Sequence, residues 1–370
     1  MLRRRGLLLG LLVAGLAIAL AAYVRWVVLA RPALHAQPPV ADALTAMPPR
    51  SGPWLMYRHT GRDANRDRIA WVPLAGDGLA VAGPPVFAPR LRCIAVYAAG
   101  DRGTCLATAL GVPPVHRLVV FDPRDFRVLQ HWPLQGLPSR TRVSADARYA
   151  ASTVFVTGHG YASATFSTQT LLYDLRTMRV LGDLESFTTL FEGRVVRSPD
   201  MNFWGVTFGR DSNRFHATLS SAGRFDLVRG DIAARRVEVI HADVECPSVS
   251  PDGRHVAFKR RRPGARETEW QLHVLELATG RTWRLTEQRS IDDQLEWLDA
   301  ATVLYTVAST ATGDPARGSG ATELWRVPIG GGAPRRFLAA AASPVVMRWS
   351  GSIATAQAPR VRTSSPYSER

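Results

Sequence analysis

The chain has 370 residues, of which 46% are hydrophobic and 21% are charged, so it carries enough apolar material for a sizeable folded core. Its formal net charge is +15, and nearly all of its basic residues are arginines, since Lys259 is the only lysine. This charge favours anionic partners such as anionic lipid or an acidic wall polymer. Nucleic acid is excluded as an expected partner, because no nucleic-acid motif or aromatic-interleaved basic element is present.

The first 30 residues have the pattern of an export segment. Three arginines at positions 3–5 precede an uncharged stretch, residues 6–24, which Arg25 closes. Such a stretch is just long enough to span a membrane as a helix. The arginine cluster stays on the cytoplasmic side, so the rest of the chain is expected outside the cytoplasm.

Two fates of this segment remain open. The small residues Ala19 and Ala21, or a later site ending at Ala36, suit a cleaved signal peptide. Arg25 and Trp26 resemble the interfacial flank of a retained anchor, which is the fate we favour. Residues 1–30 are therefore predicted to be a signal anchor or signal peptide. The protein is then held on the outer side of the cytoplasmic membrane, or secreted if the segment is cleaved.

A Pro- and Ala-rich spacer at residues 31–52 is predicted to link this segment to the folded domain. One element then recurs: an apolar run, an acidic or proline position, a turn, and a second apolar run. Its marked positions recur at intervals of 45 to 57 residues. The six copies centre on Pro73, Asp122, Asp174, Asp231, Glu276 and Pro328.

A second hairpin element precedes several of these copies. The turn at Ser250–Arg254 leads into an alternating run from His255, and the turns at 144–148 and 210–214 do the same. Two hairpins per repeat give four strands, which is one propeller blade. We therefore predict an all-β fold, a six-bladed β-propeller of four-stranded blades over residues 53–349, with a disordered tail at 350–370.

Closure of the ring requires its first and last blades to meet, because each blade buries its faces only against its neighbours. Pairing between Trp54–His59 and Val345–Trp349 is the expected closure. Cys93 and Cys105 flank a turn-rich stretch, so adjacent antiparallel strands bring them together. We expect a disulfide between them, worth roughly 3 kcal/mol, and Cys246 as a small core residue.

The Ser-Pro-Asp-Gly-Arg hairpin at 250–254 and the run Leu-His-Val-Leu-Glu-Leu-Ala-Thr-Gly-Arg-Thr at 272–282 resemble the TolB-type propeller repeat. Segments 202–208, 244–247 and 292–298 extend this resemblance to exported TolB-like proteins of GC-rich Gram-positive bacteria. TolB itself carries an α/β domain before its propeller. The present chain is expected to lack that domain, because strand-like sequence begins by about Trp54, so a transport role by analogy does not follow.

No catalytic motif emerges from the chain. There is no Gly-x-Ser-x-Gly elbow, and the alternation of Asp63, Asn65 and Asp67 fails as a calcium loop because Arg68 replaces the required glycine. We therefore expect no enzymatic activity, no metal and no cofactor.

Binding candidates come from the loops that lead into the innermost strands and line one mouth of the channel. These candidates are Asn202, Glu245, Asp292, Asp293 and Gln294, with His159 in a glycine-flanked loop. The alternative is that these groups cap strand ends. The run Lys259–Arg262 is expected to be a solvated hairpin tip or an attachment site for anionic lipid or wall polymer.

The function predicted from these residues is a protein-binding or scaffolding propeller of the bacterial cell envelope, with an envelope protein or peptide as partner. One alternative is a hydrolase or lyase that uses Asp292, Asp293, Glu245 or His159. The other is a carbohydrate-binding module that uses Trp204 or Trp297, although both rings are expected to pack between blades.

Overall fold

The computed structural model describes residues 10–25, 48, 52–76, 78–109, 111, 114–158, 166–265, 268–309 and 320–348. Residues 1–43 and 44–370 form two separate units. In the first unit, residues 10–25 are helical. Within the parts of the chain described, no helix has the length and apolar character needed to cross a membrane. His159 lies outside the described residues.

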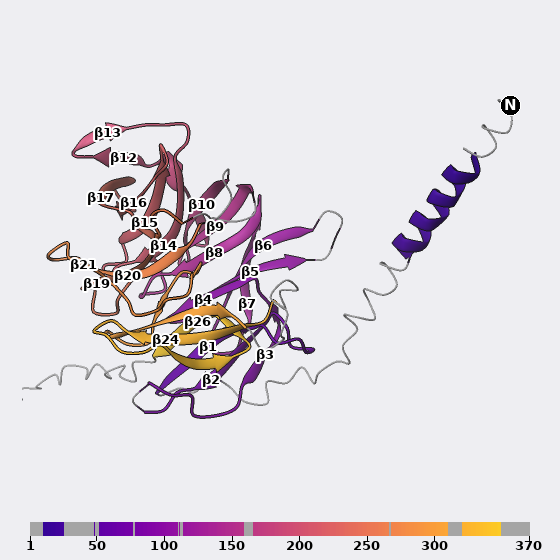
Figure 1. Cartoon of the computed structure of the whole chain (residues 1–370), viewed down its shortest axis with the longest axis horizontal. Coiled ribbons are helices and arrows are strands. Elements are labelled where there is room, and N and C mark those ends of the chain that lie inside the picture. The colour runs from indigo at the N-terminus through magenta and orange to yellow at the C-terminus, as the bar shows by residue number, and fades with distance from the viewer. Residues whose placement is uncertain are drawn as a thin grey trace, which may run out of the picture. The chain divides into compact units, whose positions relative to one another are not determined.

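The second unit is a six-bladed β-propeller whose blades are built from four strands, as the repeat predicts. Figure 1 labels most of its strands. Blade 1 comprises β26 (Ala341–Arg348), β1 (Pro53–His59), β2 (Arg68–Pro73) and β3 (Val86–Arg92). Blade 2 comprises β4 (Ala95–Ala99), β5 (Arg102–Ala109), β6 (Val115–Phe121) and β7 (Val128–Leu134). Blade 3 comprises β8 (Leu137–Val143), β9 (Tyr149–Thr157), β10 (Ser167–Asp174) and β11 (Arg179–Asp183).

The remaining blades follow in chain order. Blade 4 comprises β14 (Asn202–Phe208), β15 (Arg214–Ser221), β16 (Arg224–Asp231) and β17 (Arg236–Ala242). Blade 5 comprises β18 (Glu245–Val249), β19 (His255–Arg261), β20 (Trp270–Glu276) and β21 (Thr282–Arg284). Blade 6 comprises β22 (Glu296–Trp297), β23 (Thr302–Ala308), β24 (Thr322–Pro328) and β25 (Arg335–Ala339). The first apolar run of each repeat copy forms the third strand of its blade.

Blade 4 carries an addition that the repeat does not predict. The short helix η1 (Leu184–Ser186) is followed by a hairpin of β12 (Thr188–Phe191) and β13 (Arg194–Val196). Strand β12 pairs in parallel with the outermost strand, β17, so the sheet grows to six strands. Figure 1 shows this hairpin beyond the outer edge of the blade.

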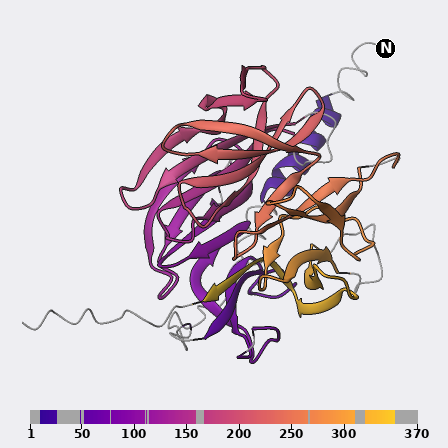
Figure 2. The same cartoon turned by 90° about the vertical axis from the view of Figure 1, so that its left-hand side faces the viewer.

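The core lies between the blades, because each sheet packs its faces against its two neighbours. One cluster joins Trp54 and Met347 of blade 1 to Val96 and Phe121 of blade 2. Equivalent clusters join the other neighbouring pairs around the ring. Full burial of one large apolar side chain stabilises a fold by roughly 1.5–3 kcal/mol. Figure 2 shows the sheets of successive blades stacked face to face.

The ring closes as the sequence predicts. The C-terminal strand β26 pairs antiparallel with β1, with Trp54 opposite Met347 and Met56 opposite Val345. Strand β26 thereby becomes the inner strand of the blade that the N-terminal strands begin. Cys93 and Cys105 form the predicted disulfide, and Cys246 is buried as a free thiol.

Candidate functional site

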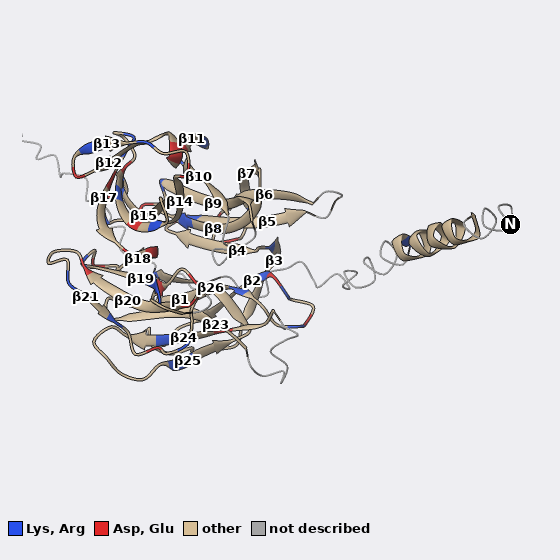
Figure 3. Ribbon diagram, turned by 45° about the horizontal axis from the view of Figure 1, so that its top comes forward, with Lys and Arg blue, Asp and Glu red and all other residues tan. Residues whose placement is uncertain are grey.

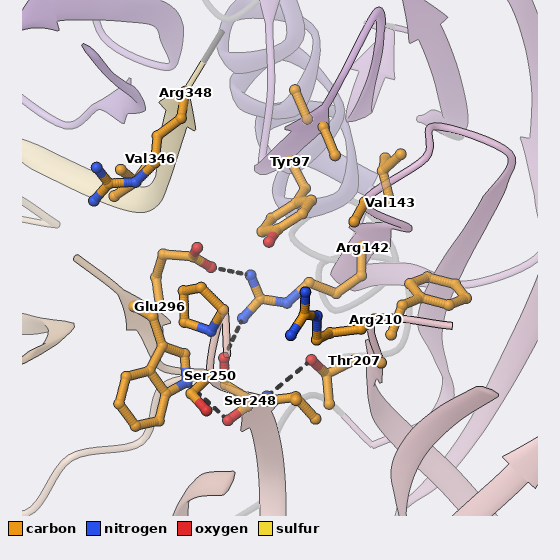
Figure 4. Close-up of a pocket in the computed structure, with 18 of the residues that line it drawn as sticks. Tyr97, Arg142, Val143, Thr207, Arg210, Ser248, Ser250, Glu296, Val346 and Arg348 are labelled. Atoms are coloured by element: carbon orange, nitrogen blue, oxygen red, sulfur yellow. Dashed lines mark hydrogen bonds and ion pairs between the residues drawn. The ribbon is translucent and has the colours of Figure 1, made fainter. Parts of the chain in front are cut away.

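A cavity of about 270 Å³ lies at one mouth of the central channel. It is bounded by the carboxyl ends of the inner strands of all six blades, β4, β8, β14, β18, β22 and β26, and by the turns that follow several of them. Its charged lining residues are Arg142, Arg210, Arg348 and Glu296. Figure 4 shows these four side chains around the cavity.

An ion pair crosses the channel at the inner end of this cavity. Arg142 of β8 donates a hydrogen bond from Nη1 to Glu296 of β22 at 2.5 Å, and both side chains are at least nine-tenths buried. Blades 3 and 6 are three positions apart in a ring of six, so the pair links opposite sides of the channel. Arg142 Nη2 donates to the Leu295 carbonyl at 2.6 Å.

Tyr97 of β4 completes this group, with the Arg142 guanidinium 4.3 Å from the centre of its ring. Burial raises the pKa of Tyr97, and the nearby Glu296 carboxylate raises it further, so the hydroxyl stays protonated. Burial also raises the pKa of Glu296, against the opposing effect of Arg142. Burial acts to lower the pKa of Arg142, but the carboxylate of its ion-pair partner Glu296 acts to raise it and the net shift is upward, so the guanidinium remains charged.

Further side chains fill the channel on the other side of this ion pair. Arg140 lies two residues before Arg142 on β8, so both face the channel, and its Nη1 is 3.8 Å from Asp293. Gln294 donates from Nε2 to the Val206 and Pro247 carbonyls at 3.0 and 3.1 Å, which joins blade 6 to blades 4 and 5. The cavity therefore ends on a floor of side chains that span the channel.

The rim of the cavity carries two exposed arginines. Arg210 follows β14, and Arg348 ends β26, where it donates to the Leu298 carbonyl. Neither forms an ion pair with an acidic residue of the described chain. The rim turns also contain Asp146 and Asp252, but each of these carboxylates accepts from a serine hydroxyl and from a backbone N–H of its own turn.

Burial acts to raise the pKa values of Asp146 and Asp252, but the hydrogen bonds from the serines outweigh it, so both pKa values lie below the usual range. These two aspartates therefore stabilise the turns as carboxylates. The lining of the cavity itself holds three arginines and one glutamate.

The predicted binding candidates that the structure describes lie at or near the amino ends of the inner strands, and none of these lines the cavity. Asn202 accepts from Thr168 N at 2.8 Å, which joins β14 to β10 of the preceding blade. Glu245 is 1% exposed and accepts from Arg261 Nε at 2.7 Å and from Trp270 Nε1 at 3.0 Å.

Asp292 and Asp293 turn to different partners. Asp292 forms an ion pair with Lys259, whereas Asp293 accepts from Thr306 N at 3.0 Å and faces Arg140. The structure thus brings Glu245 and Asp292 together around Lys259, which pairs with Glu245 in the register of β18 and β19. Each predicted binding residue that the structure describes forms hydrogen bonds or ion pairs with other groups of the protein.

The prediction for Lys259–Arg262 as a solvated hairpin tip is wrong for residues 259–261, which lie in β19, whereas Arg262 is exposed directly after that strand. Lys259 lies inside β19, is completely buried, and places its Nζ 4.1 Å from the centre of the Trp270 ring. Arg261 pairs with Glu245, and Arg262 pairs with Glu269. Strand β19 continues further than its charged sequence suggests. The Trp270 ring provides a face for Lys259, and the Glu245 carboxylate provides a partner for Arg261.

Trp204 and Trp297 are both buried, at 0% and 3% exposure, so neither presents a ring to a surface ligand. Trp297 donates from Nε1 to the Ser248 carbonyl at 2.9 Å. Among the described residues, no group of three or more His, Cys, Asp or Glu side chains could hold a metal ion.

The sequence analysis missed Arg142, Glu296 and Tyr97, although a signal for Arg142 was present. Arg142 lies two residues before Ser144 of one predicted hairpin, and Ser248 lies two residues before Ser250 of another. Alternation places both on the face of an inner strand that lines the channel. Glu296 lies inside the segment 292–298, which was noted only for its resemblance to a family.

Comparison with known proteins shows similarity at the level of fold. No protein-family model and no curated protein sequence matches the chain. The crystal structure of TolB from Acinetobacter baumannii is 16% identical, covers 83% of this chain and 69% of its own, and superposes with a TM-score of 0.54. The fold resembles that of TolB.

Two further solved structures are similar to a lesser degree. The putative TolB from Agrobacterium tumefaciens is 14% identical, with 79% of this chain and 88% of that chain covered and a TM-score of 0.44. A chain of the nidogen/laminin complex is 10% identical, with 80% and 98% covered and a TM-score of 0.49. At these identities the likeness concerns the fold alone.

Proposed function

We propose that the protein is an exported, non-enzymatic binding module, whose propeller holds an acidic segment of an envelope protein at the mouth of its channel. The observation that carries this proposal is the cavity at the carboxyl ends of the six inner strands, where three arginines face one glutamate. A partner with negative charge complements this lining. TolB-like and other propellers among the similar folds support a propeller module, and the choice of partner rests on the cavity.

Two features support export. The arginines at positions 3–5 precede the apolar segment at 6–24, which serves either as a membrane anchor or as a cleaved signal peptide. The Cys93–Cys105 disulfide fits an oxidising compartment, since structural disulfides are rare in the cytoplasm. N-terminal sequencing of the mature protein separates the two fates. An N-terminus at residue 1 or 2 shows retention, whereas one after Ala21 or after Ala36 shows cleavage.

The channel favours binding over catalysis. The buried side chains at its centre are paired with one another: Arg142 with Glu296, and Asp293 with Arg140. A general acid or base must instead be free to exchange a proton with a substrate. We therefore propose that these groups hold the channel in shape while the rim receives the partner.

The test is site-specific photo-crosslinking in intact cells. A photoreactive residue replaces Pro251, which is exposed and lines the cavity, and a control replaces Val180, which is 46% exposed on the outer strand β11. Amine-directed crosslinkers are unsuitable because the only lysine is buried. We expect one envelope protein to crosslink at position 251 and not at position 180.

Two variants locate the binding face. Arg210→Ser in the position-251 protein should abolish the crosslink, whereas the double change Asp292→Ala and Asp293→Ala, near the other end of the inner strands, should retain it. Equal capture at positions 251 and 180, or loss of capture only in the aspartate variant, contradicts the proposal. The second result would move the partner to the opposite mouth.

A further inference from the structure

The guanidinium of Arg142 has an unused donor at the floor of the cavity. Arg142 is 6% exposed. Its Nη1 donates to Glu296, and its Nη2 donates to the Leu295 carbonyl and, at 3.5 Å, to the Ser248 hydroxyl. Its buried Nε has no hydrogen-bond acceptor among the described residues. A buried donor without a partner is unfavourable, but the surrounding protein atoms enclose this Nε, so an occupant of the cavity meets Arg142 through the positive charge of its guanidinium.

The other polar groups of the cavity are already engaged. The Thr207 hydroxyl accepts from Val249 N at 3.1 Å, and the Ser250 hydroxyl donates to Asp252 at 2.5 Å. Glu296 is paired with Arg142. The donors that remain for a ligand are therefore mainly the guanidinium groups of Arg210 and Arg348 at the rim, and Arg142 contributes its charge at the floor.

This set of donors selects for carboxylate chemistry. A guanidinium presents a planar fork of N–H donors that matches two carboxylate oxygens, and such charge-assisted bonds are stronger than neutral ones. Figure 3 shows basic and acidic residues interspersed over the propeller ribbon, whereas the cavity lining holds three arginines and one glutamate. The Tyr97 ring beside Arg142 adds an apolar wall next to the charged floor.

The floor restricts how an occupant can enter. Arg142 and Glu296 span the channel, and Gln294 joins three blades on its other side. An occupant must therefore enter and leave by the same mouth, which suits the end of a chain and excludes a threaded loop. A volume of about 270 Å³ accommodates the end of a peptide or a small molecule and not a folded element.

We infer that this cavity binds a terminal carboxylate, with Arg142 at the floor and Arg210 and Arg348 at the rim as its cationic contacts. The inference rests on the proposed function and makes it specific, since the acidic segment of the partner becomes its C-terminal end. A free small dicarboxylate has the same chemistry and is the alternative source.

The experiment titrates the purified full-length protein with three probes and measures binding by ligand-observed NMR. The probes are the tripeptide N-acetyl-Ala-Gly-Ala with a free C-terminus, the same peptide with an amidated C-terminus, and succinate. We expect the free acid to bind at least tenfold more tightly than the amide. The expected preference falls to less than threefold in Arg210→Ser and in Arg142→Gln.

Arg236→Ser is the matched control, because Arg236 is exposed on the outer strand β17, far along the sheet from the inner strand. It removes the same charge and should leave the preference unchanged. Arg210 is on the surface, so Arg210→Ser keeps the test valid even if Arg142→Gln does not fold. Equal binding of acid and amide, or equal losses in Arg210→Ser and Arg236→Ser, overturns the inference.

The probes separate this inference from the proposed function. Binding of succinate without binding of either peptide supports the carboxylate site and removes the protein partner. Cellular capture at position 251 with no difference between acid and amide keeps the partner and removes the carboxylate site. Binding of the free acid with loss in Arg210→Ser supports both.

Discussion

Trp54 lies directly opposite Met347 in the antiparallel pairing of β1 with β26, so residues from the two ends of the propeller sequence share one blade. Both side chains are buried, at 0% and 4% exposure, in the cluster that joins blades 1 and 2. The closure of the ring therefore depends on a packed apolar contact as well as on the backbone hydrogen bonds of the sheet.

Met347→Ala should lower the free energy of unfolding by about 2–5 kcal/mol, because it leaves a cavity between blades 1 and 2, beside the strand that closes the ring. Met347→Leu nearly conserves the volume and should cost less than about 1.5 kcal/mol. Denaturant unfolding followed by circular dichroism measures both. Equal losses for Ala and Leu would show that packing at this position does not stabilise the closure.

Reduction of the Cys93–Cys105 disulfide should lower the free energy of unfolding by about 2–4 kcal/mol, because the closed loop restricts the unfolded chain. Thermal unfolding with and without reductant measures this difference. The chain has three cysteines, and Cys246 is free. Thiol titration in denaturant should thus detect one thiol before reduction and three after it. Three thiols before reduction would contradict the disulfide.

The fold could be predicted from the sequence because the propeller repeats its local signals. Each blade repeats an apolar run, an acidic or proline position and a turn, and three blades add a hairpin such as Ser250–Arg254 followed by β19. These weak patterns combine into one strong prediction. The closure followed from the same physics, since an open ring leaves the faces of Leu55 in blade 1 and Leu304 in blade 6 without a neighbour.

The cavity could not be predicted in the same way, because it is made by single residues from different blades. Arg142 and Glu296 meet only because blades 3 and 6 are opposite in the ring, and nothing in either local sequence specifies the other. The prediction of Lys259 as part of a solvated turn failed for a related reason. Its charged neighbours in sequence suggest a turn, whereas its neighbours in space, Trp270 and Asp292, stabilise it in a buried strand.

Stability should fall as the pH decreases from about 6.5 to about 4, because of His216. This side chain is buried on β15 between Thr207 of β14 and Arg229 of β16. Burial lowers the pKa of His216 to about 4, and Arg229 acts in the same direction. The unfolded chain, with its histidine pKa near 6.5, binds the proton more readily, so acid favours unfolding in this window.

The size of this effect is on the order of 3 kcal/mol between neutral pH and about pH 4, since one pKa unit corresponds to about 1.4 kcal/mol. His216→Phe should remove about half of the slope, because burial also lowers the pKa of His273 to about 4. The carboxylates of lowered pKa, such as Glu287 with its pKa of about 2, act at more acidic pH. Unfolding free energies measured at pH 4.5 and 7 compare the two proteins. An unchanged slope in His216→Phe would assign the effect to other groups.

Lys259 should resist amine-reactive reagents in the folded protein. It is the only lysine and is completely buried, with its ammonium group paired with Asp292. Treatment with an N-hydroxysuccinimide ester should leave Lys259 unmodified under native conditions and modify it in urea, as mass spectrometry of the digested protein can show. Asp292→Asn should speed native labelling, because it removes the partner that holds the ammonium group. Rapid labelling of the wild-type protein would contradict the buried position.

The pair of Arg142 and Glu296 should show unequal costs for its two single substitutions. Glu296→Leu leaves a buried guanidinium that cannot lose its proton, and it should destabilise the fold by about 3–5 kcal/mol. Arg142→Met leaves a buried carboxyl group that can take up a proton, so it should cost less at pH 5 than at pH 7. The direction of this pH dependence follows from the raised pKa of Glu296. Because the folded protein binds this proton more readily than the unfolded chain, the free energy of unfolding decreases as the pH increases.

The double substitution Arg142→Met with Glu296→Leu should recover most of the stability lost in Glu296→Leu, because no unpaired charge remains in the channel. Urea unfolding of the wild type, both single variants and the double variant at pH 5 and pH 7 measures the coupling energy directly. Recovery of stability together with loss of the preference for the free-acid peptide would separate the two roles of Arg142. The ion pair would then be replaceable as a structural support of the channel, whereas the charge at the cavity floor would not be replaceable for binding.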